Sequence, residues 1–334
     1  MTVIPKGYKS KLSTRETEKA IKFVKDTFQK HLVRNFGFER VSAPLFLMSG
    51  TGINDNLRGV ERPVVFDVEA LGGAKAEIVH SLAKWKRLAL KRYGFRSGEG
   101  IYTDMNAICR DGKCDNTHSV YVDQWDWEMV ISRGQRNVDF LKMAVMRVVA
   151  AIVETLAETK AHFPLIDLTL KKEVTFVTSQ DALDRYPNLG AHERERALAK
   201  EYGTVFLMNI GGALSDGKPH DGRAPDYDDW TLNGDVIFYD EVLDDGLWVA
   251  SMGVRVDGES LKRQLEIAGT TDRLEYEYHR QVIDGELPLT IGGGIGQSNM
   301  CMLLLQKAHI GEVQVGLWDD KTKTECEQNG IKLL

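Results

Sequence analysis

The chain has 334 residues, 43% of them hydrophobic and 28% charged, and a net charge of −6. This composition is typical of a folded globular protein, and the negative charge argues against a broad nucleic-acid surface, which needs clustered Lys and Arg. No run approaches the roughly 18 apolar residues of a membrane helix, and the N-terminus lacks the apolar stretch of a secretion signal. We therefore expect a cytoplasmic protein that binds neither nucleic acid nor membrane.

The cysteines are too few and too scattered for a disulfide framework, and no second Cys or His pair stands at zinc-ligand spacing. They are Cys109, Cys114, Cys301 and Cys326. We expect free thiols and no structural metal. Because the chain also lacks repeats, low-complexity tracts and linkers, residues 1–334 are predicted to form one compact domain.

The N-terminal part predicts a helix, a strand and a polar loop. Ser13 and Glu16 form a capping box, apolar residues recur at helical spacing after them, and Gly37 ends this first helix. A strand is predicted over 38–46, where Pro44 indicates an edge or an interface. The loop 50–59 is rich in turn residues, and for Asp55 within it a turn role and a ligand role both stay open.

The next segments are a cationic helix, a strand with its turn, and a long core helix. The helix opens at 80–87, where dense cations form either a solvated basic face or a functional cluster. Residues 104–111 are predicted to form the strand and turn. The helix over 138–156 carries a regular apolar stripe and is predicted to pack in the core.

The stretch Tyr121–Glu128 organises the rest of the chain. On a strand, Gln124, Asp126 and Glu128 share one face, whereas Trp125 and Trp127 share the other. Acceptor side chains in a row are costly when they are buried without partners. The polar face is therefore expected to meet a ligand, a cation or several donors; a solvent-facing edge strand is the alternative.

The C-terminal half is predicted as mixed helix and strand. A strand ends at 178, a helix covers 191–202, and a strand covers 205–210. The acidic loop 215–230 is either functional or a solvated surface. Two paired strands follow at 232–239 and 248–256, and alternation on the second predicts one shared face: Val249, Ser251, Gly253, Arg255 and Asp257.

Residues 291–298 contain a run of glycines that leads into an apolar helix at 299–305. Glycines at a strand-to-helix turn let backbone N–H groups and the positive helix end approach an anion or a nucleotide. The spacing fits neither the Rossmann pattern nor the P-loop. We interpret the segment as a turn of this kind.

Four segments in this order resemble the ammonia-dependent asparagine synthetase family, also called aspartate–ammonia ligases: residues 80–87, 118–128, 223–230 and the glycine run. The resemblance covers nearly the whole chain. It implies an α+β fold similar to class II aminoacyl-tRNA synthetases, with an antiparallel sheet flanked by helices. It also implies a homodimer, contacted through the first helix and the Pro44 strand. In this family ATP activates the aspartate side chain as an acyl-adenylate, and ammonia then gives asparagine, AMP and pyrophosphate.

The resemblance also assigns candidate roles to residues. The aspartate- or asparagine-binding pocket would contain Asp55, Ser81, Lys86, Gln124, Asp126, Arg255, Gly293 and Gly294. Of these, Lys86, Gln124, Asp126 and Arg255 are also the catalytic candidates. A zwitterion with an extra carboxylate needs such a mixture of acidic and cationic partners. ATP would lie near Arg223, Asp228 and Ser251, and Mg²⁺ at Asp235.

Three positions depart from the family pattern, all on the ATP side. Cys109 stands in place of an α-phosphate arginine, Trp248 in place of a magnesium-binding glutamate, and Asn299 in place of an arginine that stacks on adenine. Losing several charge-assisted contacts, each worth roughly 1.5–3 kcal/mol, would weaken ATP binding severely. We therefore predict a divergent paralogue that binds aspartate, asparagine or a close analogue without adenylating it.

A further hypothesis makes Cys109 a nucleophile on the side-chain carbonyl, against the alternative of an inert buried thiol. Two other functions stay open. One is the family reaction itself, with ATP and magnesium at a rebuilt site. The other is a non-catalytic amino-acid sensor or subunit partner. A tRNA synthetase is disfavoured because no anticodon-binding domain is evident and the net charge is negative.

Overall fold

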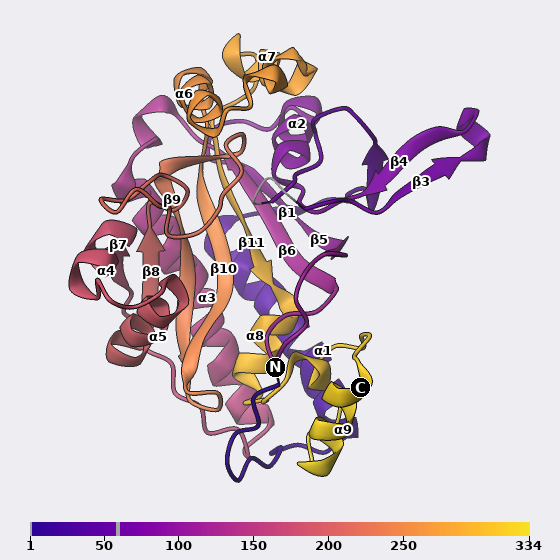
Figure 1. The fold of residues 1–334 in the computed structure, drawn as a ribbon, viewed down its shortest axis with the longest axis vertical. Coiled ribbons are helices and arrows are strands. Elements are labelled where there is room, and N and C mark those ends of the chain that lie inside the picture. The colour runs from indigo at the N-terminus through magenta and orange to yellow at the C-terminus, as the bar shows by residue number, and fades with distance from the viewer. Residues whose placement is uncertain (1, 58–60) are drawn as a thin grey trace.

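The computed structural model describes residues 2–57 and 61–334 (Figure 1). Its centre is an eight-stranded sheet with the strand order β1-β5-β6-β11-β10-β9-β8-β7. Neighbours from β5 to β8 run antiparallel, whereas β1 and β7 add parallel edges. The predicted α+β class, an antiparallel sheet flanked by helices, is therefore confirmed, with parallel edge strands in addition.

The strands are β1 Glu39–Arg40, β2 Phe46–Met48, β3 Val65–Val68, β4 Ala74–Ile78, β5 Gly100–Ile108, β6 Tyr121–Val130, β7 Thr175–Thr178, β8 Thr204–Met208, β9 Asp228–Asp240, β10 Asp245–Arg255 and β11 Thr290–Gly296. The helices are α1 Thr14–Phe36, α2 Ala83–Tyr93, α3 Val138–His162, α4 Ser179–Arg185, α5 Ala191–Tyr202, α6 Gly258–Ala268, α7 Glu277–Ile283, α8 Gln297–Leu304 and α9 Asp320–Gln328. Within the described ranges, no helix combines the length and apolar character that crossing a bilayer requires.

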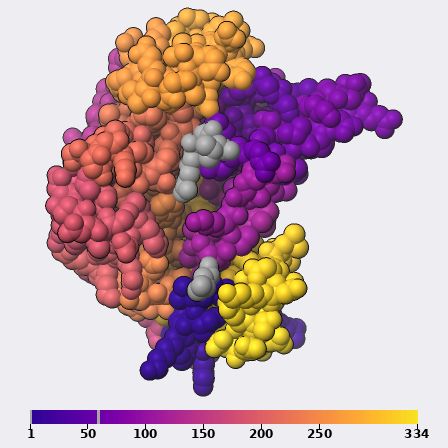
Figure 2. All heavy atoms as spheres, viewed as in Figure 1, coloured from indigo at the N-terminus to yellow at the C-terminus, as the bar shows by residue number. Residues whose placement is uncertain are grey.

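The two faces of the large sheet are covered differently. Helices α1, α3 and α8 pack on one face and form the main core, which includes Trp125 and Trp127. On the other face α2 packs on β5, and α4 and α5 pack on β8 and β9. The middle strands of this second face carry polar side chains, so the fold leaves a polar floor between α2 and α5. Figure 2 shows a hollow in the surface between the side of the molecule that carries α2 and the side that carries α5.

Helix α1 forms where the sequence predicts it. Ser13 and Glu16 cap each other's backbone N–H groups, and Gly37 ends the helix with φ 72°. The apolar stripe of Val24, Phe28 and Leu32 is fully buried against the chain's own sheet. This stripe is therefore not available to a second subunit.

The predicted strand at 38–46 is wrong in its extent. Residues 39–40 pair with β5, whereas Phe46 begins β2 in a separate three-stranded sheet with order β2-β4-β3. Pro44 lies between the two strands, where its missing N–H interrupts a ladder. The small sheet forms an arm that projects from the body (Figure 1). Leu45, Phe46 and Val65 on this arm are about half exposed.

Asp240 at the β9–β10 turn gives a prediction about stability. Burial raises the pKa of its carboxyl to about 6, and one of its oxygens is buried with no partner in the described chain. The other oxygen accepts from Val242 N at 2.8 Å. Because the folded pKa is raised, the stabilising contribution is complete below the unfolded pKa near 4 and is lost as pH rises through about 6.

Asp240→Asn keeps the turn acceptor and removes the buried charge. We expect it to raise the free energy of unfolding by roughly 1–2 kcal/mol at pH 8 and by little near pH 4.5. Urea unfolding at both pH values measures the difference. Asp216→Asn is the matched control, since the exposed Asp216 also accepts from a turn N–H, that of Lys218, at 3.0 Å. An equal gain in both variants would contradict the burial argument.

Candidate active site

Strand β6 places its side chains as the alternation predicts. Trp125 and Trp127 are fully buried in the main core, and Gln124, Asp126 and Glu128 lie on the opposite face. The strand lies between β5 and β11, so the alternative of a solvent-facing edge strand is wrong. Glu128 is completely buried. A buried carboxylate needs a cation or several donors, and both α2 and β10 supply cations.

Lys86 reaches the polar floor from α2. Its Nζ lies 2.6 Å from Asp126 Oδ1 and 3.7 Å from Glu128 Oε2, and it donates to the carbonyl oxygens of Trp127 and Gly293 at 2.9 and 3.3 Å. Burial lowers the pKa of Lys86, although both carboxylates oppose this. The alternative of a solvated basic face is therefore wrong for residues 80–87, because Lys84, Lys86 and Arg87 are all buried.

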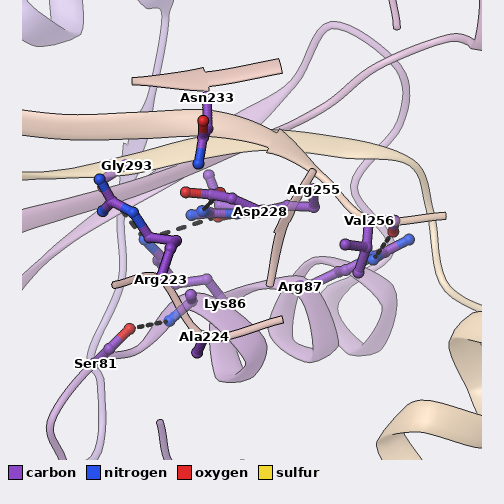
Figure 3. A network of polar contacts seen from close by, with 12 residues as sticks. Ser81, Lys86, Arg87, Arg223, Ala224, Asp228, Asn233, Arg255, Val256 and Gly293 are labelled. Carbon is purple, nitrogen blue, oxygen red and sulfur yellow. Dashed lines mark hydrogen bonds and ion pairs between the residues drawn. The ribbon is translucent and has the colours of Figure 1, made fainter. Parts of the chain in front are cut away.

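Arg255, at the end of β10, joins two carboxylates. Its Nε and Nη2 donate to Glu128 at 2.7–3.1 Å, and its Nη1 donates to Asp228. Figure 3 shows Arg223, Asp228 and Arg255 close together above Lys86. The chain thus builds a buried row of alternating charges, from Asp126 through Lys86, Glu128 and Arg255 to Asp228.

The glycine run is a strand and not a turn. Gly292, Gly293 and Gly294 lie inside β11, between β6 and β10. A Cβ on Gly292 would lie 1.9 Å from Glu128 Oε2, and one on Gly294 would lie 2.2 Å from Gln124 Oε1. The glycines therefore make room for side chains that lie across the strand. The N-terminus of α8 is occupied by Asp123, which accepts from Ser298 N at 3.0 Å.

The face predicted for β10 is correct only in part. Ser251, Gly253 and Arg255 share the polar face, but an irregularity between Trp248 and Ala250 places Val249 in the main core. A bulge of this kind reverses the alternation before it. Asp257 lies beyond the strand, where it caps α6.

The loop before β3 brings Asp55 to the site. One Asp55 oxygen accepts from Leu57 N at 3.1 Å, and the other is buried with no partner among the described residues. Burial raises the pKa of Asp55 to about 7. The positive charge of Lys84 lowers this pKa, whereas the negative charge of Asp226 raises it further. Ser81 Oγ accepts from Ala83 N at 3.1 Å, at the start of α2. The turn role of Asp55 is present, together with an unused acceptor.

Arg223 and Asp235 meet on the β9 side of the floor. Arg223 Nη2 donates to both Asp235 oxygens at 2.9 Å, and Ser251 is the cross-strand neighbour of Asp235. Protein-held Mg²⁺ uses carboxylate oxygens that are available to it. Asp235 is already neutralised, and Trp248 stands where the resemblance implies a second carboxylate. These residues do not fit a protein-held magnesium ion.

The three departing residues have their own partners. Trp248 donates its indole N–H to Glu195 at 3.0 Å and packs against α5. Asn299 donates to Thr117 O at 3.1 Å. Cys109 lies in the connection between β5 and β6. Burial raises the pKa of its thiol, and the negative charge of Glu61 raises it further. A nucleophilic cysteine needs a lowered pKa, so the structure argues against that role.

Comparison with known proteins identifies the relatives of this chain. Residues 15–330 match the family model described as aspartate-ammonia ligase. The chain is 54% identical to the aspartate–ammonia ligase of Clostridium perfringens over 331 residues, which cover 99% of this chain and 98% of that one. It is 52% identical to that of Levilactobacillus brevis over 332 residues, 99% of each. The chain belongs to the aspartate–ammonia ligase family.

Solved structures show the fold relationship. The Entamoeba histolytica asparaginyl-tRNA synthetase matches with a TM-score of 0.64 at 15% identity, over 90% of this chain and 67% of that one. The Pyrococcus horikoshii asparaginyl-tRNA synthetase, complexed with asparaginyl-adenylate, matches with a TM-score of 0.64 at 15% identity, over 91% and 70%. The predicted class II synthetase-like fold is therefore confirmed for this aspartate–ammonia ligase family member.

Some residues of the site carry only a weak signal in the sequence. Glu128 was part of the polar row but was not assigned a role, although it pairs with both Lys86 and Arg255. Lys84 and Asp226 form a buried ion pair at 2.7 Å beside the site. In the sequence, this pair is indicated only by the many charged residues in the two segments that contain it. The two residues are 142 positions apart, so their contact depends on the fold.

Proposed function

We propose that this chain is an aspartate–ammonia ligase, which amidates the side-chain carboxylate of aspartate with ammonia and converts ATP to AMP and pyrophosphate. The observation that carries the proposal is the full-length identity of 52–54% to relatives of that name. The polar floor between α2 and α5 supports it. We further propose that residues 1–334 work as a single catalytic domain in the cytoplasm.

The donor count at the floor supports a division of labour. Lys86 uses its N–H groups on Asp126 and two carbonyl oxygens, so it holds the floor in place. Arg255 uses Nε, one Nη1 N–H and one Nη2 N–H inside the protein. A guanidinium has five donors, so two remain for a substrate carboxylate. The α-ammonium of aspartate would meet Asp55, Gln124 and Asp126.

Nucleotide contacts in this proposal come from Arg223, with Ser251 on the same floor. Arg223 would exchange its contact with Asp235 for a phosphate oxygen, since an arginine binds phosphate strongly. Transfer of the AMP group to the side-chain carboxylate releases pyrophosphate. Attack of ammonia on the resulting acyl carbon then releases AMP and leaves asparagine.

A second candidate is chemistry at the side-chain carboxyl or amide without ATP, in a divergent paralogue. It is favoured by Cys109, Trp248 and Asn299, which stand where the resemblance implies two cations and one carboxylate on the nucleotide side. It is also favoured by the pairing of Asp235 with Arg223, which leaves little free negative charge for a magnesium nucleotide.

Calorimetric titration with magnesium ATP, aspartate and asparagine separates the two candidates, together with an assay for AMP and pyrophosphate in the presence of aspartate and ammonium chloride. AMP formation that depends on both aspartate and ammonia supports the ligase. Amino-acid binding without ATP binding excludes it. In that case the variant with Cys109→Arg, Trp248→Glu and Asn299→Arg is expected to gain ATP binding. Amino-acid binding without turnover in any variant indicates a sensor.

We also propose a homodimer, formed through the β2-β4-β3 arm. Leu45, Phe46, Met48, Val65 and Leu71 expose 42–58% of their surface there. The register places Phe46 and Met48 on one face of the small sheet together with Phe66, and exposed apolar side chains on one face mark association surfaces. Because the stripe of α1 is buried in its own core, the contact is expected at the arm and the segment after Pro44.

Phe46→Asp tests the dimer. Phe46 stacks edge-on against Phe66 with ring centroids 5.3 Å apart, and a charge at the centre of an apolar contact costs several kcal/mol. We expect the variant to be monomeric by light scattering at concentrations where the wild type is dimeric. Leu165→Asp is the control, since Leu165 is 63% exposed and lies in the segment after α3. A monomeric wild type would contradict the proposal.

A further inference from the structure

A second buried cluster lies beside the polar floor, centred on the carboxylate of Asp226. One Asp226 oxygen accepts from Lys84 Nζ at 2.7 Å and from Arg273 Nη1 at 2.9 Å, and His279 Nε2 lies 2.9 Å from the same oxygen. These partners come from α2, from the 3₁₀ turn Thr271–Glu275 and from α7. Lys84, Asp226 and His279 are buried. One carboxylate therefore joins α2 to the segment 271–283, which is distant from it in the sequence.

Two of these partners also hold the loop that carries Asp55. Lys84 Nζ donates to Gly52 O at 3.0 Å, and Arg273 Nη2 donates to Asn56 Oδ1 at 3.1 Å. At Gly52 the loop lies directly on Tyr276, since a Cβ there would be 2.5 Å from the ring. Asp55 therefore lies between Gly52 and Asn56. These two residues accept from Lys84 and Arg273, and both cations also pair with Asp226.

The charges around Asp55 come from the same cluster. Lys84 and Arg273 face it from α2 and the 3₁₀ turn, while Asp226 and Tyr227 face it from the segment before β9. His80 Nδ1 lies 3.0 Å from the Asp55 carbonyl oxygen. Asp55 and Asp226 each have one buried side-chain oxygen without a partner in the described chain. Buried acceptors without donors are costly, so this side of the pocket is prepared for a group that donates.

We propose that Asp226 is a positioning residue: through Lys84 and Arg273 it holds loop 52–57 so that the unpartnered Asp55 oxygen receives the α-ammonium of an amino acid. This inference rests on the proposed function and deepens it. Asp226 itself does not touch the side-chain carboxyl that reacts. It sets the amino-acid affinity, and the pH at which that affinity is lost, without a direct role in bond formation.

Calorimetric titration with aspartate between pH 6 and 9 tests the proposal. In the wild type we expect affinity to fall as pH drops through about 7, because Asp55 then takes up a proton. Asp226→Asn removes a neighbouring negative charge, so the midpoint moves to lower pH, and the loosened loop weakens binding at pH 8 roughly tenfold. Arg273→Gln removes a cation that lowers the pKa of Asp55, so its midpoint moves to higher pH.

Opposite shifts in the two variants distinguish a positioning role from general destabilisation, which would move both in one direction or neither. Asp229→Asn is the matched control: Asp229 is equally buried but pairs with Arg136, and we expect no shift. Unchanged midpoints in both test variants overturn the inference. If the wild type binds no aspartate, the proposed function fails separately. In that case amide hydrogen exchange of residues 52–57 is compared between the wild type and Asp226→Asn. Equal exchange rates in the two proteins overturn the positioning role.

Discussion

Replacing Lys86 with methionine is expected to lower kcat/KM for aspartate roughly 10²- to 10³-fold and the free energy of unfolding by roughly 3–5 kcal/mol. Methionine has a similar length, so the change removes the charge and leaves little cavity. Asp126 and Glu128 then remain buried with one cation fewer between them. Asp126 loses its partner at 2.6 Å, and the polar floor proposed to bind the amino acid loses its shape.

Lys91→Met is the matched control for this prediction. Lys91 is on the same helix but exposed, where it pairs with Glu286 at 3.1 Å. A surface ion pair contributes about 0–1 kcal/mol, so both activity and stability are expected to stay near the wild-type values. Activity is measured as asparagine formed, and binding by calorimetry in case turnover is too slow to follow. A Lys86→Met protein with wild-type aspartate affinity would show that the charge row is structural only.

The parts of the site that alternation controls were predictable from the sequence. On β6, successive side chains point to opposite faces, so a polar row opposite two tryptophans already separates floor from core. On β10 the same rule misplaced Val249, because a bulge has no signal in the order of residue types. A single irregular residue is enough to exchange the faces.

Burial of charge was not predictable in the same way. The α2 segment contains Lys84, Lys86 and Arg87, and composition alone favours exposure for such residues. Their partners lie on β6, before β9 and between β10 and α6, so only the tertiary fold brings the charges together. The glycine run was misread for a related reason. Glycine has low strand propensity, but here side chains from β6 and β10 occupy the space above β11, where a larger residue would clash with them.

Gly292→Ala is expected to lower the free energy of unfolding by roughly 3–5 kcal/mol. The new Cβ would lie 1.9 Å from Glu128 Oε2 and 2.6 Å from Arg255 Nη2. Neither side chain can turn aside cheaply, because each is held by the other. Glu128 must leave Arg255, and a buried ion pair is then broken on both sides.

Gly294→Ala gives the comparison that isolates this cause. Its Cβ would meet Gln124 Oε1 at 2.2 Å, but Gln124 is uncharged and only half-buried. Its side chain can rotate, so we expect a loss of about 1–2 kcal/mol together with weaker aspartate binding. Gly212→Ala, with no atom of the described chain within 4 Å of the added carbon, is expected to be neutral. Chemical denaturation of the three variants measures the order. Equal losses at Gly292 and Gly294 would mean that strand conformation, and not the Glu128–Arg255 pair, requires these glycines.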